Sequence, residues 1–236
     1  MPCLNEETSV GECVTTAFAA LERAGWHGEV IVVDNGSSDQ SAPLALQLGA
    51  RVVWEPACGY GYACLAGLRA ARGSVMVLGD ADSTYDFAEL SLLIKKIQEG
   101  CELVLGTRFR ANSILPARLL SKRYLGNLAL TLTLNWLFDL HLTDTQTGMR
   151  ALRREAFERM DLRAGGMEFA SEMLIHAKKA NLQVGEVPIH YHQRKGYSKL
   201  RPFADGKRHA QLILAQKFGR RGDPFHDETA IISTRL

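Results

Sequence analysis

Residues 74–82 have the sequence Ser74-Val75-Met76-Val77-Leu78-Gly79-Asp80-Ala81-Asp82. The apolar run up to Leu78 is typical of a buried strand. In an extended chain, residues two apart point to the same side, so we expect Asp80 and Asp82 to lie together at the strand's end. Two such carboxylates repel each other and lose solvation unless a cation neutralises them. The stretch therefore predicts a site for Mg²⁺ or Mn²⁺ carrying a diphosphate, with a solvated strand-end turn as the alternative.

A second apolar run ends in the same way. Residues 29–33 (Glu-Val-Ile-Val-Val) are followed by Asp34 and by the turn-forming sequence Asn-Gly-Ser-Ser-Asp at 35–39. In open α/β sheets, ligands bind beyond the carboxyl ends of the strands. Two strands that each end in an acidic residue and a polar loop predict a nucleotide-binding crevice.

Composition and charge narrow the class of protein. The 236 residues are 46% hydrophobic with a formal net charge of +2, which predicts a globular protein with a core and gives no reason to expect nucleic acid as a partner. Two segments, 108–123 and 194–221, are rich in Lys and Arg. They are either solvated surface or contacts to phosphate or to an anionic membrane surface.

The five cysteines show no C-x-x-C spacing and no partner histidine pattern, so we expect reduced thiols in a cytoplasmic protein. No secretory signal is expected at the N-terminus. No apolar stretch reaches the roughly 18 residues that a transmembrane helix needs. The predicted organisation is one domain over residues 1–215 and a polar, poorly ordered tail over 216–236.

Strand and helix patterns alternate along the chain and predict an α/β fold with a mostly parallel sheet and helices on both faces. Strands are expected at 30–33, 51–54, 74–78, 102–106 and 186–191, and helices at 5–24, 41–48, 63–71, 87–99, 155–160 and 169–180. The last strand should lie at the sheet edge because it contains Pro188. Residues 113–140 carry too many apolar side chains for one helical stripe, so this helix is either buried in the core or in contact with a membrane or partner.

The chain resembles glycosyltransferase family 2 from Pro2 to about Leu214. The motifs that carry the resemblance are Pro2-Cys3-Leu4-Asn5-Glu6-Glu7, Val32-Val33-Asp34-Asn35-Gly36-Ser37-Ser38-Asp39, Gly79-Asp80-Ala81-Asp82, Gly106-Thr107-Arg108-Phe109, Asp144-Thr145-Gln146-Thr147-Gly148-Met149-Arg150 and Tyr191-His192-Gln193-Arg194-Lys195-Gly196-Tyr197-Ser198-Lys199-Leu200. The last three look most like the branch that transfers a sugar to a polyprenyl phosphate. The resemblance implies the Rossmann-like GT-A fold.

The resemblance also implies roles for individual residues. It assigns the donor nucleotide to Pro2, Asn5, Glu6, Asp34, Ser37, Asp80 and Arg108; the metal to Asp80 and Asp82; catalysis to Asp82 and Asp144; and the acceptor or its phosphate to Arg150, Arg194, Ser198 and Lys199. Asp34 could instead cap a turn. Because a phosphate monoester is mostly ionised at neutral pH, Asp144 could orient the acceptor or hold a basic side chain rather than act as a base.

Three further pairs of residues are open to two interpretations. Glu168 and Glu172 share a helical face and could contact Arg, a metal or solvent. His190 and His192 share a strand face and are expected to pack or hydrogen-bond rather than bind metal. Tyr60 and Tyr62, beside glycines, line the crevice or belong to the core.

The resemblance implies an inverting glycosyltransferase that uses Mg²⁺ or Mn²⁺ to move a mannose or glucose from a GDP- or UDP-sugar to a dolichyl or undecaprenyl phosphate. The expected location is peripheral, on the cytoplasmic face of a membrane. The alternatives are a family member with a soluble sugar or small-molecule acceptor, and a non-catalytic protein that binds a nucleotide-sugar.

The chain departs from the family pattern at both ends. Relatives carry an apolar strand directly before the motif at Pro2, where this sequence has only Met1. A missing strand would leave the neighbouring strand with an unpaired edge. Either the start of the sequence has been assigned too late, or the fold tolerates a shortened first strand with lower stability. Many bacterial relatives continue into transmembrane helices after the basic loop, whereas a polar tail follows here.

Overall fold

The computed structural model describes residues 1–109, 122–195 and 199–219. The first half contains β1 (Pro2–Cys3), α1 (Val10–Arg23), β2 (Ile31–Asp34), α2 (Ser41–Gln47), β3 (Arg51–Trp54), α3 (Tyr60–Ala70), β4 (Val75–Leu78), the 3₁₀ helix η1 (Phe87–Glu89), α4 (Leu90–Gln98) and β5 (Leu103–Thr107). The second half contains α5 (Lys122–Phe138), β6 (Arg150–Arg153), α6 (Arg154–Glu158), α7 (Phe169–Lys179), β7 (Val184–Pro188) and α8 (Pro202–Phe218).

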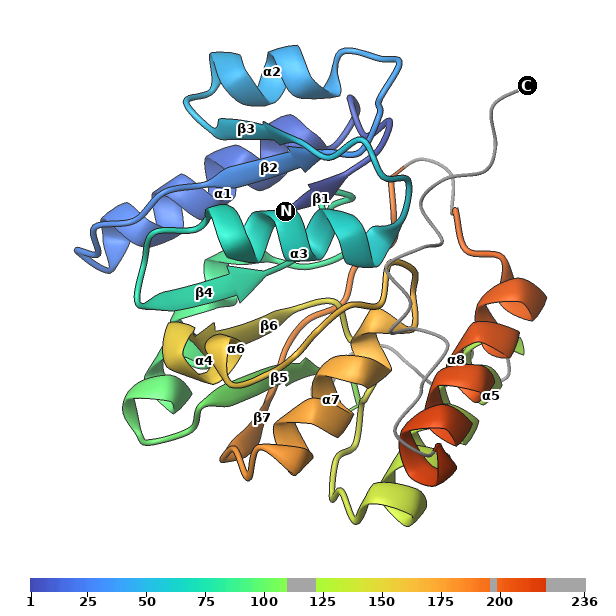
Figure 1. The fold of residues 1–236 in the computed structure, drawn as a ribbon. Coiled ribbons are helices and arrows are strands. Elements are labelled where there is room, and N and C mark those ends of the chain that lie inside the picture. Colours follow the sequence, from blue (N-terminus) through green and yellow to red (C-terminus); the bar gives the residue numbers. More distant parts are fainter. Residues whose placement is uncertain (110–121, 196–198, 220–236) are drawn as a thin grey trace.

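The strands form two hydrogen-bonded sheets rather than the one sheet that we expected. β1, β2 and β3 are parallel, and the second sheet has the order β4-β6-β5-β7 (Figure 1). β6 runs antiparallel to both β4 and β5, whereas β5 and β7 are parallel. The strand β6 was not predicted, and the expected edge position of β7 is confirmed.

β1 pairs in parallel with β2. β1 pairs Pro2 with Val33 and Cys3 with Asp34, and the Met1 ammonium donates to the Ile31 carbonyl at 2.8 Å. Among the described residues, β4 pairs in a ladder with β6 alone, so its other edge is open. Among the described strands, no ladder joins the two sheets.

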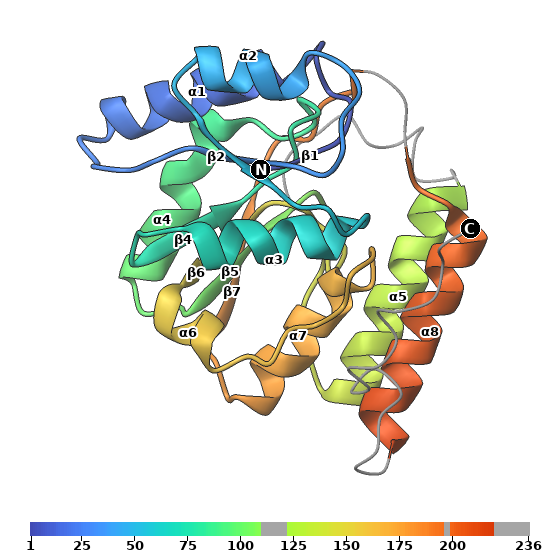
Figure 2. The same cartoon turned by 45° about the horizontal axis from the view of Figure 1, so that its top comes forward.

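Helices cover both faces of the sheets. α1 and α4 pack on one face, where Val14, Leu93 and Val104 belong to one apolar cluster. α3 and α7 pack on the other face, where Leu68, Leu105 and Met173 belong to the second cluster (Figure 2). Alternate residues of β5 point into different clusters because successive strand side chains face opposite ways.

α5 and α8 lie side by side against α7 at the margin of the domain (Figures 1 and 2). Leu134 of α5 is fully buried, whereas Leu132 and Trp136 of the same helix are exposed. The helix expected within residues 113–140 thus has one face in the core and another facing outwards. Residues 110–121 of that segment lie outside the described residues.

Local differences from the expected elements have simple causes. α1 begins at Val10 rather than near Asn5, because the backbone N–H groups of Asn5 and Glu6 bond the side chains of Ser37 and Ser41. α8 continues to Phe218, past the expected domain end at 215, and residues 220–236 of the expected tail lie outside the described residues.

Candidate active site

The site lies beyond the carboxyl ends of β2 and β4. Asp34 is the last residue of β2, and β4 ends at Leu78, so Asp80 and Asp82 belong to the loop that follows the strand. Their directions are therefore not set by the alternation of side chains along a strand. The loop nonetheless places Asp82 near enough to Asp80 for its charge to help raise the pKa of Asp80.

Asp80 lies between α3 and the polar loop that precedes β6. The Tyr60 hydroxyl donates to Asp80 Oδ1 at 3.0 Å. Gly148 approaches so closely that a Cβ placed on it would lie 2.5 Å from Asp80 Oδ2. Burial, and after it the charge of Asp82, raises the pKa of Asp80 to about 6. A cation at this point would relieve both effects.

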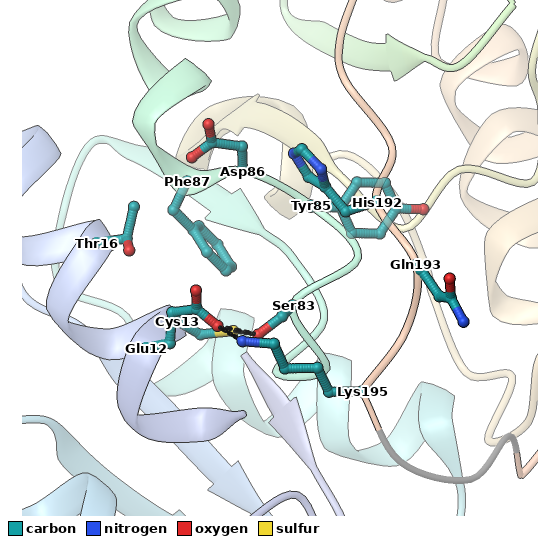
Figure 3. A pocket seen from close by; sticks show the side chains of 10 residues that line it. All are labelled: Glu12, Cys13, Thr16, Ser83, Tyr85, Asp86, Phe87, His192, Gln193 and Lys195. Carbon is teal, nitrogen blue, oxygen red and sulfur yellow. Dashed lines mark hydrogen bonds and ion pairs between the residues drawn. The ribbon is translucent and has the colours of Figure 1, made fainter. Parts of the chain in front are cut away.

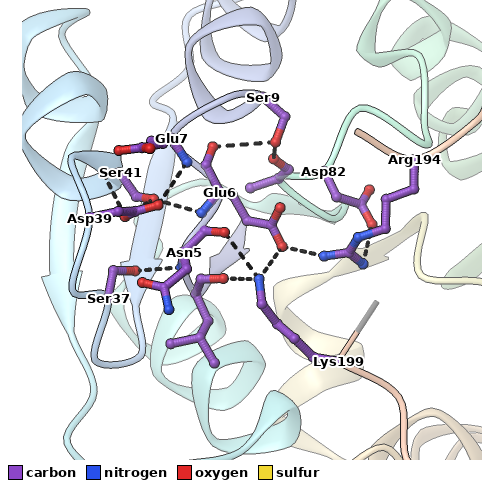
Figure 4. Close-up of polar contacts among 12 residues, drawn as sticks. Asn5, Glu6, Glu7, Ser9, Ser37, Asp39, Ser41, Asp82, Arg194 and Lys199 are labelled. Carbon is purple, nitrogen blue, oxygen red and sulfur yellow. Dashed lines mark hydrogen bonds and ion pairs between the residues drawn. The ribbon is translucent and has the colours of Figure 1, made fainter. Parts of the chain in front are cut away.

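Asp82 is buried and bound from two directions. Its Oδ1 accepts from the backbone N–H and the hydroxyl of Thr84 at 3.0 and 2.5 Å, and its Oδ2 accepts from Arg194 Nη1 at 2.7 Å. The same guanidinium donates to the Glu6 carboxylate, which also accepts from Lys199 Nζ at 2.6 Å (Figure 4). Arg194 thus links the acidic tetrad to the N-terminal motif.

The N-terminal motif is held against the loop after β2. Asn5 N–H donates to Ser37 Oγ at 2.9 Å, and Glu6 N–H donates to Ser41 Oγ at 2.7 Å (Figure 4). Ser37 N–H donates to Asp34 Oδ1 at 3.3 Å. Pro2, in β1, pairs with Val33. In this structure Asp34 closes a turn, which was the alternative to a nucleotide contact.

The basic segment after β7 crosses the site. His192 N–H donates to the Thr84 carbonyl at 2.9 Å, and Lys195 N–H donates to the Asp82 carbonyl at 3.3 Å. Lys195 Nζ binds the Glu12 carboxylate at 2.6 Å. A pocket of about 320 Å³ lies beside this segment, and its lining includes His192, Lys195 and Ser83 (Figure 3). Ser198, expected to bind phosphate, lies outside the described residues.

Arg108 and Asp144 form a buried pair. Arg108 Nε and Nη2 donate to Asp144 Oδ2 and Oδ1 at 2.6 and 2.7 Å, and the backbone N–H of Arg108 donates to Oδ2 at 3.1 Å. The guanidinium also lies 5.1 Å from the ring centroid of Tyr191. Glu186 accepts from the N–H of Asp144 at 3.0 Å, so the loop position of this carboxylate is held as well. Asp144 therefore holds a basic side chain in this structure, which was one of its two alternative roles.

Arg150 is also buried, and its Nε, Nη1 and Nη2 each donate to a backbone carbonyl, those of Thr147, Ala170 and Thr145 respectively, at 2.9 Å. Its expected contact with phosphate stays a prediction, since in this structure it fastens the polar loop to α7. Within the described residues, the Thr147 hydroxyl of that loop is a buried polar group without a hydrogen-bond partner.

The sequence left the role of one residue of the site open and gave no sign of two others. Tyr60, which could have belonged to the core, contacts Asp80. The first turn of α3 can pack there because a Cβ on Gly61 would lie 2.0 Å from the Ala164 carbonyl oxygen, and only glycine permits that approach. Thr84 and Glu186 were missed because neither belongs to a recognisable pattern.

Glu168, Glu172 and His190, whose roles the sequence left open, each have hydrogen-bond partners within the protein. Glu172 accepts from the backbone of 163 and 164, and its pKa rises to about 7, mainly through burial. Glu168 accepts from Gly166 N–H at 3.0 Å. His190 binds Glu89 at 2.7 Å, as expected of a hydrogen-bonding histidine.

The donor set fits a divalent cation that is shared with a diphosphate. Within the described residues, no three His, Cys, Asp or Glu side chains gather in a way that could hold a metal alone. Mg²⁺ in nucleotide sites is commonly bound by one or two carboxylates plus phosphate oxygens. Asp80 and Asp82 can supply that pair, and the phosphate would supply the rest.

Comparisons with known proteins identify the family of the chain. Residues 1–161 match the family model for glycosyl transferase family 2. The chain is 39% identical over 221 residues to the low-salt glycan biosynthesis hexosyltransferase Agl6 of Haloferax volcanii, covering 93% of this chain and 53% of Agl6. It therefore spans about half the length of that relative. It is 33% identical over 207 residues to a dolichyl-phosphate hexose transferase of the same organism, covering 87% of each.

Solved structures give the fold. Glucosyl-3-phosphoglycerate synthase from Mycobacterium tuberculosis, in complex with Mn²⁺, uridine diphosphate and phosphoglyceric acid, has a TM-score of 0.76, 20% sequence identity, and coverage of 94% of this chain and 78% of that chain. Another structure of that synthase holds Mg²⁺ and uridine diphosphate, with a TM-score of 0.70, 21% identity, and coverage of 92% and 77%. The chain belongs to glycosyl transferase family 2, with the GT-A fold, and is a glycosyltransferase.

Proposed function

We propose that the protein transfers a hexose from a UDP- or GDP-sugar to a polyprenyl phosphate, with Mg²⁺ or Mn²⁺. The observation that carries the proposal is the contact of Asp82 and Glu6 with Arg194 and Lys199. Carboxylates that suit a metal and cations that suit phosphate meet at one place. The name of the dolichyl-phosphate hexose transferase relative supports a lipid-linked acceptor.

On the donor side, Arg194 now neutralises Asp82, one of the two carboxylates that a metal would contact. A bound metal at Asp80 and Asp82 would supply positive charge to the leaving nucleoside diphosphate. Arg194 would then no longer be needed to neutralise Asp82. It could bind a diphosphate oxygen instead, because guanidinium groups bind phosphate through paired N–H donors. Lys199 could do the same as a point charge.

On the acceptor side, the reaction needs no base. An ionised oxygen of the acceptor phosphate attacks the anomeric carbon from the side opposite the leaving group. A new carbon–oxygen bond forms, the bond to the nucleoside diphosphate breaks, and the electron pair leaves with the diphosphate, so the configuration inverts. No proton has to be removed from a phosphate dianion. In this scheme the role of Asp144 is to hold the Arg108 guanidinium in place.

A membrane-bound acceptor suits the surface of α5 and α8. Trp136 is 82% exposed and Phe203 is 97% exposed, and Leu132 and Leu214 are exposed as well. Lys207, on α8, is an exposed cation that can attract anionic lipids. No described helix is long and apolar enough to span a bilayer, so the proposed association is peripheral.

The proposal is tested by transfer from radiolabelled UDP-glucose and GDP-mannose to a polyprenyl phosphate in detergent, with Mn²⁺ and with or without EDTA. We expect labelled glycolipid from one donor, and its loss with EDTA. Metal-dependent transfer only to a water-soluble acceptor would move the activity to a family member with a small-molecule acceptor. Metal-dependent nucleotide binding without transfer to any acceptor would indicate a non-catalytic protein.

Membrane association is tested by sedimentation with vesicles that contain anionic lipid. Trp136→Glu and Phe203→Glu should each lower the bound fraction several-fold. Trp54→Glu is a matched control, because Trp54 is 74% exposed but lies on β3, away from α5 and α8. Equal binding by all three variants would contradict this assignment of the surface.

A further inference from the structure

One edge of β3 has no partner strand. β3 ends the sheet order β1-β2-β3, so among the described strands it pairs with β2 alone (Figure 1). On that side, the N–H groups of Arg51 and Glu55 donate to the carbonyls of residues 30 and 34 at 2.8 and 3.0 Å. Because the backbone groups of successive strand residues point to opposite sides, the N–H and C=O groups of Val52 and Trp54 point away from β2.

The side chains of this strand suit pairing with another strand. Trp54 is 74% exposed, and Arg51, Val52 and Val53 are half-buried. An exposed strand edge is a template on which another chain can pair. Residues 51–55 (Arg-Val-Val-Trp-Glu) carry a cation at one end and a carboxylate at the other. Two copies of this strand that lie antiparallel therefore bring opposite charges together at both ends.

Three antiparallel registers set the outward-facing residues of two copies opposite each other, centred on Val52, Val53 or Trp54. In the register centred on Val52, Trp54 faces Ala50, whose N–H already donates to an α2 carbonyl at 3.0 Å, so the Trp54 carbonyl stays unpaired. In the register centred on Trp54, Val52 faces Pro56, which has no N–H to donate. Only the register centred on Val53 pairs every outward N–H and C=O group of Val52 and Trp54.

The same register pairs the charges. It sets Arg51 of one copy opposite Glu55 of the second copy, whereas in the other two registers Arg51 is not opposite a carboxylate. Arg51 Nε binds Glu29 at 2.9 Å and Nη2 donates to the Ala70 carbonyl at 2.6 Å, so the guanidinium is held beside the strand. A guanidinium has five N–H donors and can bind a second carboxylate. Opposite charges directly across two strands stabilise their pairing.

We propose that two copies of this chain pair through β3 as antiparallel strands about a two-fold axis at Val53, with Arg51 of each copy against Glu55 of the other. The β1-β2-β3 sheets of the two copies then form one continuous sheet. A two-fold interface requires a surface that complements itself, and the backbone and charge patterns of β3 both meet that requirement at one register. Because the ladder is short beside a standard interface of about 1,600 Å², the dimer should dissociate on dilution.

The proposal is independent of the transfer reaction, so the test is self-association of the full chain without nucleotide or metal. Sedimentation velocity over a wide range of concentrations should show a monomer–dimer equilibrium, with slowed hydrogen exchange at Val52 and Trp54 in the dimer. Trp54→Pro removes an outward N–H from each copy and no bond to β2, so it should weaken the dimer by about tenfold or more. Trp136→Glu is the matched control, because Trp136 is an exposed tryptophan on α5 and should not affect pairing through β3.

A pair of charge variants tests the register itself. Arg51→Glu and Glu55→Arg should each dimerise several-fold more weakly than the parent, because like charges then face each other at both ends. An equal mixture of the two variants should recover the dimer, since a mixed pair has opposite charges at both ends. Thermal melting checks that each variant is folded. The proposal is overturned if the parent stays monomeric throughout, if Trp54→Pro dimerises like the parent, if Trp136→Glu abolishes association, or if the mixture associates no better than its separate components.

Discussion

Asp82 and Asp144 are both buried carboxylates that bind an arginine, but the two arginines are held differently. Arg194 reaches Asp82 from the segment after β7, and its side chain is 27% exposed. Arg108 binds both oxygens of Asp144 through two side-chain nitrogens and its own backbone N–H, and its side chain is only 9% exposed. The first pair can open when a ligand arrives, whereas opening the second would leave a charge buried.

This difference separates a ligand-exchangeable part of the site from a supporting part. Asp82 and Glu6 bind the cations Arg194 and Lys199, which a metal and a diphosphate could replace, and Asp80 lies beside them. Arg108, Asp144 and Arg150 hold the polar loop beside Asp80. Substitutions in the first part should affect activity more than stability, and substitutions in the second should do the reverse.

The largest effect is expected for Asp82→Asn. Loss of a metal ligand should remove several kcal/mol of stabilisation from the leaving diphosphate, which is a fall of about a thousandfold in transfer rate. The unfolding free energy should change by no more than about 1 kcal/mol, because the partner Arg194 remains partly solvated. The control is Asp86→Asn, since Asp86 caps η1 and asparagine caps equally well. Transfer that is equal in the two variants would refute the metal role.

Asp144→Asn should instead lower the unfolding free energy by about 3 kcal/mol, because it leaves Arg108 buried without its counter-ion. Urea denaturation measures this change. The double variant Arg108→Gln/Asp144→Asn should recover part of the lost stability, since neither charge remains. A variant with unchanged stability and abolished transfer would show that Asp144 acts on the acceptor directly.

Arg194→Gln should weaken donor binding by about 10- to 100-fold, since hydrogen bonds to charged groups contribute roughly 1.5–3 kcal/mol. The effect should appear in KM for the nucleotide-sugar. Lys195→Gln is the matched control, because Lys195 forms an exposed pair with Glu12. A KM that is unchanged in Arg194→Gln would place the diphosphate elsewhere.

The smallest effect is the pH dependence of the ligand-free protein. Because the folded pKa of Asp80 is raised to about 6, this group's contribution to stability is full below about pH 4 and is lost as the pH rises through 6. Asp80→Asn should flatten the unfolding free energy across that window. Glu172→Gln should flatten a window that extends to about pH 7. A profile for Asp80→Asn that matches the parent would contradict the raised pKa.

Local signals predicted much of this molecule. The apolar runs at β2 and β4 and the acidic residues after them were recognisable because a buried strand and a loop are each encoded by consecutive residues. These features depend on neighbours in sequence.

The features that could not be predicted depend on distant partners. Arg108 and Asp144 are 36 residues apart, and Asp82 and Arg194 are 112 apart, so no spacing rule connects them. β6 was missed because its four residues have arginine at both ends and because the ladders to β4 and β5 decide its state. The contact of Tyr60 with Asp80 required the packing of α3 beside β4.

The metal site is the central claim, and Mn²⁺ binding followed by electron paramagnetic resonance tests it most directly. Titrations of the parent chain, Asp82→Asn and Asp86→Asn would be made with and without UDP or GDP. We expect one Mn²⁺ per chain that tightens with nucleotide, unchanged in Asp86→Asn and lost in Asp82→Asn. Nucleotide-coupled Mn²⁺ binding that survives in Asp82→Asn would contradict the account.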